Sequence, residues 1–343
     1  MTNIHHLIKD LYRLDYSNLK VIDDLIGNIE AHLSAHGSDL KLELALHTIK
    51  ARKQDELNSG FDKVCEAAEF VVNKLKDQED WDIIEFDIFC AVLGNIKSYK
   101  LTVSMMDKSL DMLERNFKNL PDYEYRKARI FTEMTWRLLR AKFLDQIDPQ
   151  EVKKLFDTCV KSAMHIWEKL GHVAIRTNLL VREAIFNGNP DEILKCVRAV
   201  EDTRDKYWIK SSKDETVEYI RFLKPNVTLE LHNFMFGWQI KKRRKELGIG
   251  TMELANMIGS TQNMINEIER GVKGIGVERI YVIMQALQVQ NPSYFFGEPL
   301  VSASVVAKDI HEYQAMQLMS GMSEKTKDAA VDFLKKLVEL RQK

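Results

Sequence analysis

Residues 236–297 read FGWQIKKRRKELGIGTMELANMIGSTQNMINEIERGVKGIGVERIYVIMQALQVQNPSYFFG. This stretch predicts a compact bundle of short helices with turn residues between them. At its centre, Gly259 opens a turn and Thr261 can cap the helix that follows. Ile265 and Ile268 recur at the spacing of an inward-facing helical surface. The outer face of that helix then carries Gln262, Asn263, Asn266 and Glu267.

The amide side chains on this outer face indicate what the helix binds. Gln and Asn each carry a donor and an acceptor on one planar group, which matches the N6/N7 edge of adenine in the major groove. We therefore predict DNA recognition by a helix inserted in a groove, with Gln262, Asn263 and Asn266 as base readers. For Glu267 two roles stay open, because its carboxylate can accept from N4 of cytosine or pair with a neighbouring cation.

The same segment resembles the Cro/repressor-type helix-turn-helix of bacterial and phage regulators, the XRE-like family. The positions that carry the resemblance are Ile240–Arg244, Glu253-Leu254-Ala255, Gly259-Ser260-Thr261-Gln262, Ile268-Glu269-Arg270-Gly271 and Ala286-Leu287-Gln288-Val289. The resemblance implies a lambda-repressor-like domain of five helices. It also implies that Arg244 and Glu269 form an internal ion pair, which gives these two residues a structural role.

One position departs from the family pattern. The second helix of the family commonly opens with Ser-Gln or Asn-Gln, whereas this chain has Gly250-Thr251. Glycine lacks the side-chain oxygen that caps a helix, so the cap is expected to be weaker. Thr251 can still reach a phosphate.

The charge of residues 236–297 is positive, with eight Lys and Arg against five Asp and Glu, and five of the cations stand in a row at Lys241–Lys245. Cations contribute affinity for nucleic acid without reading its sequence. The side chains best suited to contact phosphates are Lys241, Lys242, Arg243, Lys273, Thr261 and Thr251.

Composition favours an almost wholly helical chain of two or three domains. The 343 residues include 45% hydrophobic and 29% charged residues but only 6 Pro, and the net charge is −1. The cysteines lack C-x-x-C spacing and are expected to be buried thiols: Cys65, Cys90, Cys159 and Cys196. No signal peptide or membrane-spanning run is visible, so we expect a cytoplasmic protein.

The N-terminal part reads as a series of helical hairpins. After two helical patterns within residues 3–35, helices are expected near 39–57, 60–77, 80–97, 101–119, 122–145, 149–170, 172–187 and 190–208. Two-helix units that begin near residues 39, 80 and 122 suggest an α-solenoid of tetratricopeptide-like character. An irregular helical bundle is the alternative. Ser211–Asp214 is expected to break the pattern, with a short helix at Thr216–Leu223.

Three domains follow from these patterns. Residues 1–222 form a helical repeat-like sensor and oligomerisation domain, residues 234–298 the helix-turn-helix domain, and residues 300–343 a C-terminal helical hairpin. The apolar stripe of that hairpin, from Ala330 to Leu340, must be buried against the repeat domain or a second subunit.

No signature of an enzyme is present, and no metal or cofactor site is expected. His32 and His36 lie four residues apart, but no third ligand follows at a suitable spacing. The GVKGIG run at Gly271–Gly276 lacks the strand and the Lys-Ser/Thr ending of a phosphate-binding loop.

The predicted function is a sequence-specific transcriptional regulator of bacterial, phage or plasmid origin, acting as a repressor. A homodimer on a palindromic double-stranded operator is expected, because one such unit reads few base pairs. A peptide or a protein effector would act through the N-terminal domain. The side chains that could grip a peptide, or could equally be half-buried packing, are Tyr99, Tyr123, Tyr125, Trp136, Trp167, Arg137, Arg140, Asn178 and Arg182. The alternative function is an interaction adaptor whose helix-turn-helix no longer binds DNA.

Overall fold

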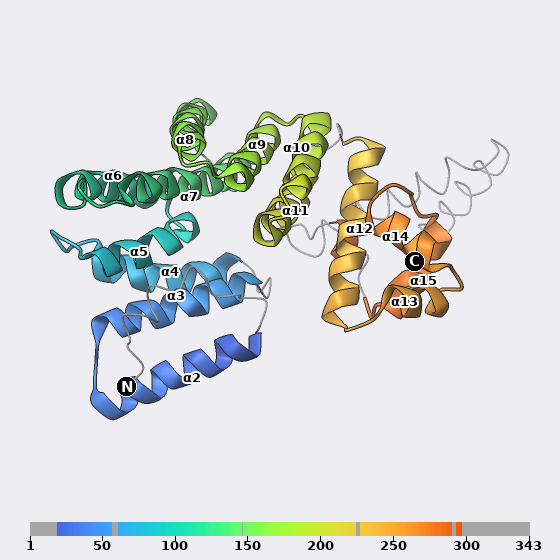
Figure 1. Ribbon diagram of the computed structural model, residues 1–343, viewed down its shortest axis with the longest axis horizontal. Coiled ribbons are helices and arrows are strands. Elements are labelled where there is room, and N and C mark those ends of the chain that lie inside the picture. Colours follow the sequence, from blue (N-terminus) through green and yellow to red (C-terminus); the bar gives the residue numbers. More distant parts are fainter. Residues whose placement is uncertain (1–18, 57–60, 146, 224–226, 290–292, 297–343) are drawn as a thin grey trace, which may run out of the picture. The chain divides into compact units, whose positions relative to one another are not determined.

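The computed structural model describes residues 19–56, 61–145, 147–223, 227–289 and 293–296, and each regular element within these ranges is a helix. The expected all-α class is therefore confirmed for this part of the chain (Figure 1). The helical pattern at Ile4–Leu11 and the C-terminal hairpin of residues 300–343 lie outside the described residues.

Most α-helices up to residue 246 are longer than those after it, although the helices at Ile83–Val92 and Val277–Ala286 both have 10 residues (Figure 1). In order these are α2 (Leu19–His36), α3 (Leu40–Glu56), α4 (Phe61–Leu75), α5 (Ile83–Val92), η1 (Leu93–Asn95), α6 (Tyr99–Asn116), α7 (Tyr123–Leu144), α8 (Pro149–Lys169), α9 (Val173–Asn187), α10 (Pro190–Asp202), α11 (Lys206–Ile220), η2 (Arg221–Leu223), α12 (Leu229–Glu246), α13 (Thr251–Met257), α14 (Gln262–Glu269), α15 (Val277–Ala286) and α16 (Ser293–Phe296).

The described residues divide into two compact units. The first runs to Gly188 and resumes over Lys195–Ser212, and the second comprises Asn189–Leu194 and the chain from Lys213 onward. Within the first unit most helices pack against the next one along the chain, as helical hairpins do. Its tetratricopeptide-like character stays a prediction.

Helix boundaries in the first unit follow the local sequence. The carboxylate of Asp148 accepts a hydrogen bond from the backbone N–H of Gln150 at 2.9 Å, and α8 begins with Pro149 between them. α9 ends at Asn187, and the next residue, Gly188, caps it with a φ of 69°, which suits glycine in the left-handed region. These starts and stops lie where the turn residues predict them.

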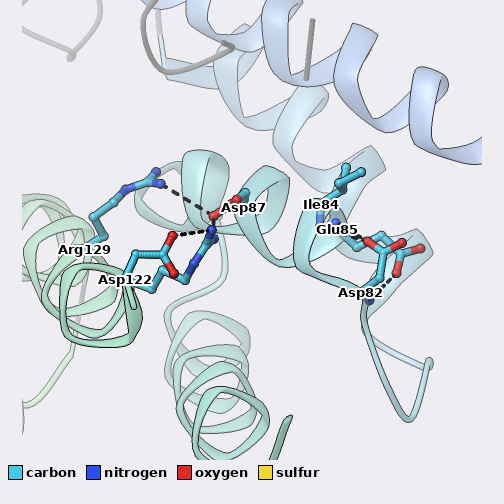
Figure 2. A network of polar contacts seen from close by, with 7 residues as sticks. Asp82, Ile84, Glu85, Asp87, Asp122 and Arg129 are labelled. Atoms are coloured by element: carbon cyan, nitrogen blue, oxygen red, sulfur yellow. Dashed lines mark hydrogen bonds and ion pairs between the residues drawn. The ribbon is translucent and has the colours of Figure 1, made fainter. Parts of the chain in front are cut away.

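Helix α5 shows how polar side chains fix one helix in the first unit. Asp82 caps α5 by accepting from the backbone N–H groups of Ile84 and Glu85, and the Glu85 carboxylate accepts from the backbone N–H of Asp82 in return (Figure 2). This reciprocal capping box satisfies donors that a helix N-terminus leaves unpaired.

Ion pairs then join α5 to α7, the helix that packs against α5, α6, α8 and α9. Asp87 accepts a hydrogen bond from Arg126 and lies 4.0 Å from the guanidinium of Arg129, while Asp122 accepts from Arg126 at 2.9 Å (Figure 2). The side chains of both arginines are almost 90% buried, so the network specifies how the two helices meet.

The expected break at Ser211–Asp214 is wrong, because α11 continues through it from Lys206 to Ile220. The Ser212 side chain is completely buried, and its hydroxyl accepts a hydrogen bond from the side-chain N–H of Asn178 on α9 at 2.8 Å. Ser and Asp are weak helix formers. Tertiary contacts of this kind outweigh that local preference here.

The second unit is organised around α12, whose backbone approaches the end of α14 very closely. A Cβ atom built on Gly237 would lie 1.9 Å from the carbonyl oxygen of Ile268, and one on Gly271 would lie 2.3 Å from Cα of Phe234. Glycine at these positions lets the two helices cross in contact. Their shared core includes the buried residues Phe236, Ile240, Leu254, Ala255, Ile265, Ile268, Ile283, Met284, Ala286, Leu287 and Phe295.

Candidate nucleic-acid interface

Helix α14 begins as its sequence predicts. Gly259 has a φ of 61°, so the chain turns there in a conformation that glycine adopts without strain. The hydroxyl of Thr261 accepts a hydrogen bond from the backbone N–H of Met264 at 3.2 Å and caps the helix. Ile265 and Ile268 are buried, so the opposite face of α14 is turned outward.

The outward face of α14 carries the predicted base readers. Gln262, Asn263 and Asn266 are exposed, and Glu267 is half-buried. Arg270, at the C-cap of α14, is also exposed and follows Asn266 by four residues. The sequence reading missed Arg270, although its spacing from Asn263 and Asn266 already places it on the same face.

Two side-chain hydrogen bonds orient the amides. The side-chain N–H of Gln262 donates to the hydroxyl of Thr251 at 3.0 Å, so the first residues of α13 and α14 are held together. The side-chain N–H of Asn263 donates to the carboxylate of Glu267 at 3.1 Å. Glu267 therefore contacts a neighbouring amide. Its two predicted roles, accepting from N4 of cytosine or pairing with a neighbouring cation, stay predictions.

The start of α13 has the glycine N-cap expected from the sequence. Gly250 has no side-chain oxygen, so it cannot accept a hydrogen bond from the free backbone N–H groups in the first turn of α13. The Glu253 carboxylate instead accepts from the backbone N–H of Gly250 at 3.3 Å. The N-terminus of α13, with Thr251 as its first residue, thus keeps backbone donors turned toward solvent.

Arg244 and Glu269 join the end of α12 to the end of α14. Nε and Nη2 of Arg244 donate to the two carboxylate oxygens of Glu269 at 2.6 and 2.9 Å, and Nη1 donates to the carbonyl of Ile249 at 2.7 Å. Both side chains are less than a tenth exposed. This buried, two-pronged pair fixes the pose of α14 relative to α12.

The basic run at Lys241–Lys245 is only partly available for a ligand. Lys242 lies 3.3 Å from the carboxylate of Asp214. Arg243 donates to the carbonyl of Leu287 at 3.1 Å and pairs with Glu246. With Arg244 also paired, three of the five cations have intramolecular partners.

Two other cations predicted to contact phosphate are Lys273, outside the basic run, and Lys241, its first residue. Lys273 is exposed in the segment between α14 and α15, and Lys241 is half-buried on α12. The structure therefore brings Thr251, Thr261 and Gln262 together, and it places Lys242 and Arg243 in contacts within the protein. A phosphate contact by Lys242 or Arg243 would have to compete with these partners.

Among the described residues, no three or more His, Cys, Asp or Glu side chains are grouped so as to hold a metal ion. The four cysteines are buried, and burial raises the pKa of the Cys65, Cys90 and Cys159 thiols to about 12. Thiols with such pKa values stay protonated and unreactive at neutral pH. No helix of the described ranges is long and apolar enough to cross a membrane.

Comparison with known proteins agrees with this geometry over the second unit. Residues 240–290 match the helix-turn-helix family. The chain is also 36% identical over 64 residues to a protein of Sinorhizobium fredii named as an uncharacterized HTH-type transcriptional regulator, y4wC, which covers 19% of this chain and 44% of that protein. The chain thus spans less than half of the length of this curated relative. No solved structure matches.

Proposed function

We propose that this protein is a sequence-specific DNA-binding transcriptional regulator in which α14 enters the major groove. The observation that carries the proposal is the exposed face of α14, with Gln262, Asn263 and Asn266, on a helix held by the buried Arg244–Glu269 pair. The match to the helix-turn-helix family over residues 240–290 supports it.

The amides supply direct readout of base edges. Asn and Gln side chains bind adenine through N6 and N7, and each good two-pronged pair is worth about 1–3 kcal/mol of discrimination against a wrong base. The hydrogen bond from Gln262 to Thr251 pre-orients one amide before DNA arrives. Asn263 would exchange its contact with Glu267 for a base, or keep it and present the carboxylate to cytosine.

Phosphate contacts would come from the edges of the same surface. The start of α13 with Thr251 and the start of α14 with Thr261 present backbone N–H groups and hydroxyls, which suit phosphate oxygens. Lys273 and Lys241 add positive charge. Arg270 lies on the outward face and would contact the phosphate backbone beside the last base that α14 reads.

Repression, a homodimer on a palindromic operator and a cytoplasmic location complete the proposal. A dimer would double the few base pairs that one α14 reads, and two-fold symmetry would match the operator. The N-terminal unit would receive a peptide or a protein effector. Arg137, Asn178 and Arg182 are each at least 90% buried and bonded within that unit, so an effector would bind through other side chains.

A second candidate function is an interaction adaptor that has lost DNA binding. The observation that favours it is the internal engagement of side chains that DNA would need, because Lys242, Arg243 and Asn263 each have a partner in the protein. The same experiment decides between the two candidates.

That experiment is selection of DNA from a randomised double-stranded library by the purified full-length chain, followed by fluorescence anisotropy on the recovered sequence. The Gln262→Ala, Asn263→Ala double variant should lose roughly 5- to 150-fold in affinity for each base pair no longer read. Gln285→Ala, at an exposed position of α15, is the matched control and should bind like the parent. Recovery of no common sequence, or equal binding by the double variant, would favour the adaptor.

A further inference from the structure

The C-terminal half of α11 buries an unusual number of polar side chains. Ser212, Lys213, Glu215 and Thr216 are between 0% and 5% exposed. Burying such groups is costly unless they find partners. This stretch is therefore built for specific polar contacts and not for general apolar packing.

Lys213 and its half-buried neighbour Asp214 contact α12 within the second unit. The ammonium of Lys213 lies 4.9 Å from the ring centroid of Phe234 and 4.7 Å from that of Trp238, so it is held by two aromatic faces. Asp214 accepts a hydrogen bond from the indole N–H of Trp238 at 3.0 Å and one from Lys242 at 3.3 Å.

The segment of α12 that α11 contacts is the one that supports α14. The backbone of Phe234 touches Gly271, and Gly237, next to Trp238, touches the carbonyl of Ile268. Both contacts leave no room for a Cβ atom, so a shift of α12 in this region must move the end of α14 as well. Lys213 and Asp214 contact α12, and α12 in turn contacts the end of α14, so a change at either residue can alter the position of α14.

The preceding residue of α11 is anchored elsewhere. Ser212 belongs to the first unit, where its hydroxyl is bonded to Asn178, whereas Lys213 belongs to the second.

We propose that Lys213 and Asp214 are positioning residues for α14, acting through their contacts with Phe234, Trp238 and Lys242 of α12. The inference rests on the proposed DNA-binding function. Neither residue lies within the family match at 240–290, and neither needs to touch DNA.

The test uses the full-length chain with Lys213→Met, which keeps most of the side-chain volume but removes the cation, and Asp214→Asn, which keeps an acceptor for the Trp238 indole but removes the ion pair with Lys242. Each should bind the selected DNA about tenfold more weakly. For Lys213→Met the dependence of affinity on salt should stay unchanged, because Lys213 lies over aromatic rings of α12 and no phosphate contact is lost. Lys213→Arg, whose guanidinium can also lie over aromatic rings, should restore binding.

Lys206→Met is the matched control, because Lys206 is exposed at the start of the same helix. It should bind DNA like the parent. A folded Lys213→Met protein with parental affinity, or a Lys213→Arg protein as weak as Lys213→Met, would overturn the proposal.

A readout without DNA separates this inference from the proposed function. Amide hydrogen exchange over Ile265–Gly271 should become faster in Lys213→Met and not in Lys206→Met. If no DNA binds the parent, the proposed function fails while faster exchange still supports the positioning role. If the parent binds DNA and exchange over α14 is unchanged, the positioning role fails alone.

Discussion

Replacing Gly237 by alanine should destabilise the helix-turn-helix unit, although the same change normally stabilises a helix. Gly237 lies inside α12, nine residues from its last residue Glu246. Alanine in a helix interior is favoured over glycine by about 1 kcal/mol. Local preference alone therefore predicts a gain in stability.

The tertiary structure predicts a loss of stability instead. The new Cβ would lie 1.9 Å from the carbonyl oxygen of Ile268, whereas real Cβ contacts essentially never fall below 3.0 Å, so α12 and α14 must separate by at least 1.1 Å (3.0 − 1.9). The neighbour is backbone and cannot rotate away. A gap of 0.5–1 Å already forfeits about a quarter to a half of each dispersion contact, and overpacking costs about 1–3 kcal/mol. Because the atom in the way is backbone, we take the upper end of that range, about 3 kcal/mol, and the expected net loss is about 2 kcal/mol after the helix-propensity gain of about 1 kcal/mol.

Gly27→Ala is the matched control. Gly27 lies within α2, is exposed, and has nothing within 4 Å of its hypothetical Cβ. Native-state hydrogen exchange reports the opening free energy of each region separately. In Gly237→Ala the opening free energy should fall for the amides of Ile265 and Ile268. In Gly27→Ala it should rise by about 0.5–1 kcal/mol for the amides of α2.

DNA affinity provides the second assay. Gly237→Ala should bind the selected DNA more weakly, because the end of α14 is displaced. A Gly237→Ala protein whose α14 amides gain protection, as the α2 amides of Gly27→Ala should, would refute the close crossing of α12 and α14.

Three further predictions concern charge. Arg244→Met leaves the Glu269 carboxylate buried without its cation and should cost about 3–5 kcal/mol in chemical denaturation, much of which an added Glu269→Leu should recover. Lys273→Gln should reduce the slope of log affinity against log salt by about 0.9 if Lys273 neutralises one phosphate. Burial first, and then the nearby Lys50, lowers the pKa of His47 below its ordinary 6.5. The stability that neutral His47 contributes is thus present above pH 6.5 and lost as pH falls through the lowered pKa, so His47→Phe should be less acid-sensitive than the parent between pH 7.5 and 5.

Each of these has a result that contradicts it. Equal stability of Arg244→Met and the double variant would mean that the unpaired carboxylate carries no penalty. A parental salt slope in Lys273→Gln would place that side chain away from phosphate. Parallel curves of stability against pH for the parent and His47→Phe would contradict the burial argument for His47. His36→Phe, at the exposed last residue of α2, serves as the control.

The features that local chemistry controls were predictable. The turn at Gly259, the cap at Thr261 and the outward amides of α14 follow from residue types and helical spacing. The start of α8 at Pro149 follows in the same way. Each depends on contacts within a few residues, which sequence displays directly.

Contacts between distant residues were not predictable in the same way. Ser211–Asp214 is a poor helical sequence, yet it continues α11 because Ser212 and Lys213 find partners on α9 and α12. From the sequence, Lys242 and Arg243 of the basic run of α12 were expected to be available to DNA. In the structure Lys242 bonds to Asp214, which is 28 residues away, and Arg243 bonds to the carbonyl of Leu287, which is 44 residues away.

The sequence by itself thus determined the helical class, the helix-turn-helix and the side chains on its outer face, because helical periodicity, caps and turn residues act over a few positions. The tertiary structure alone decided which cations stay available for a ligand. It also decided that Gly237 must be glycine and that α11 contacts α12, because these depend on how close separate helices approach and on which polar groups they bury together.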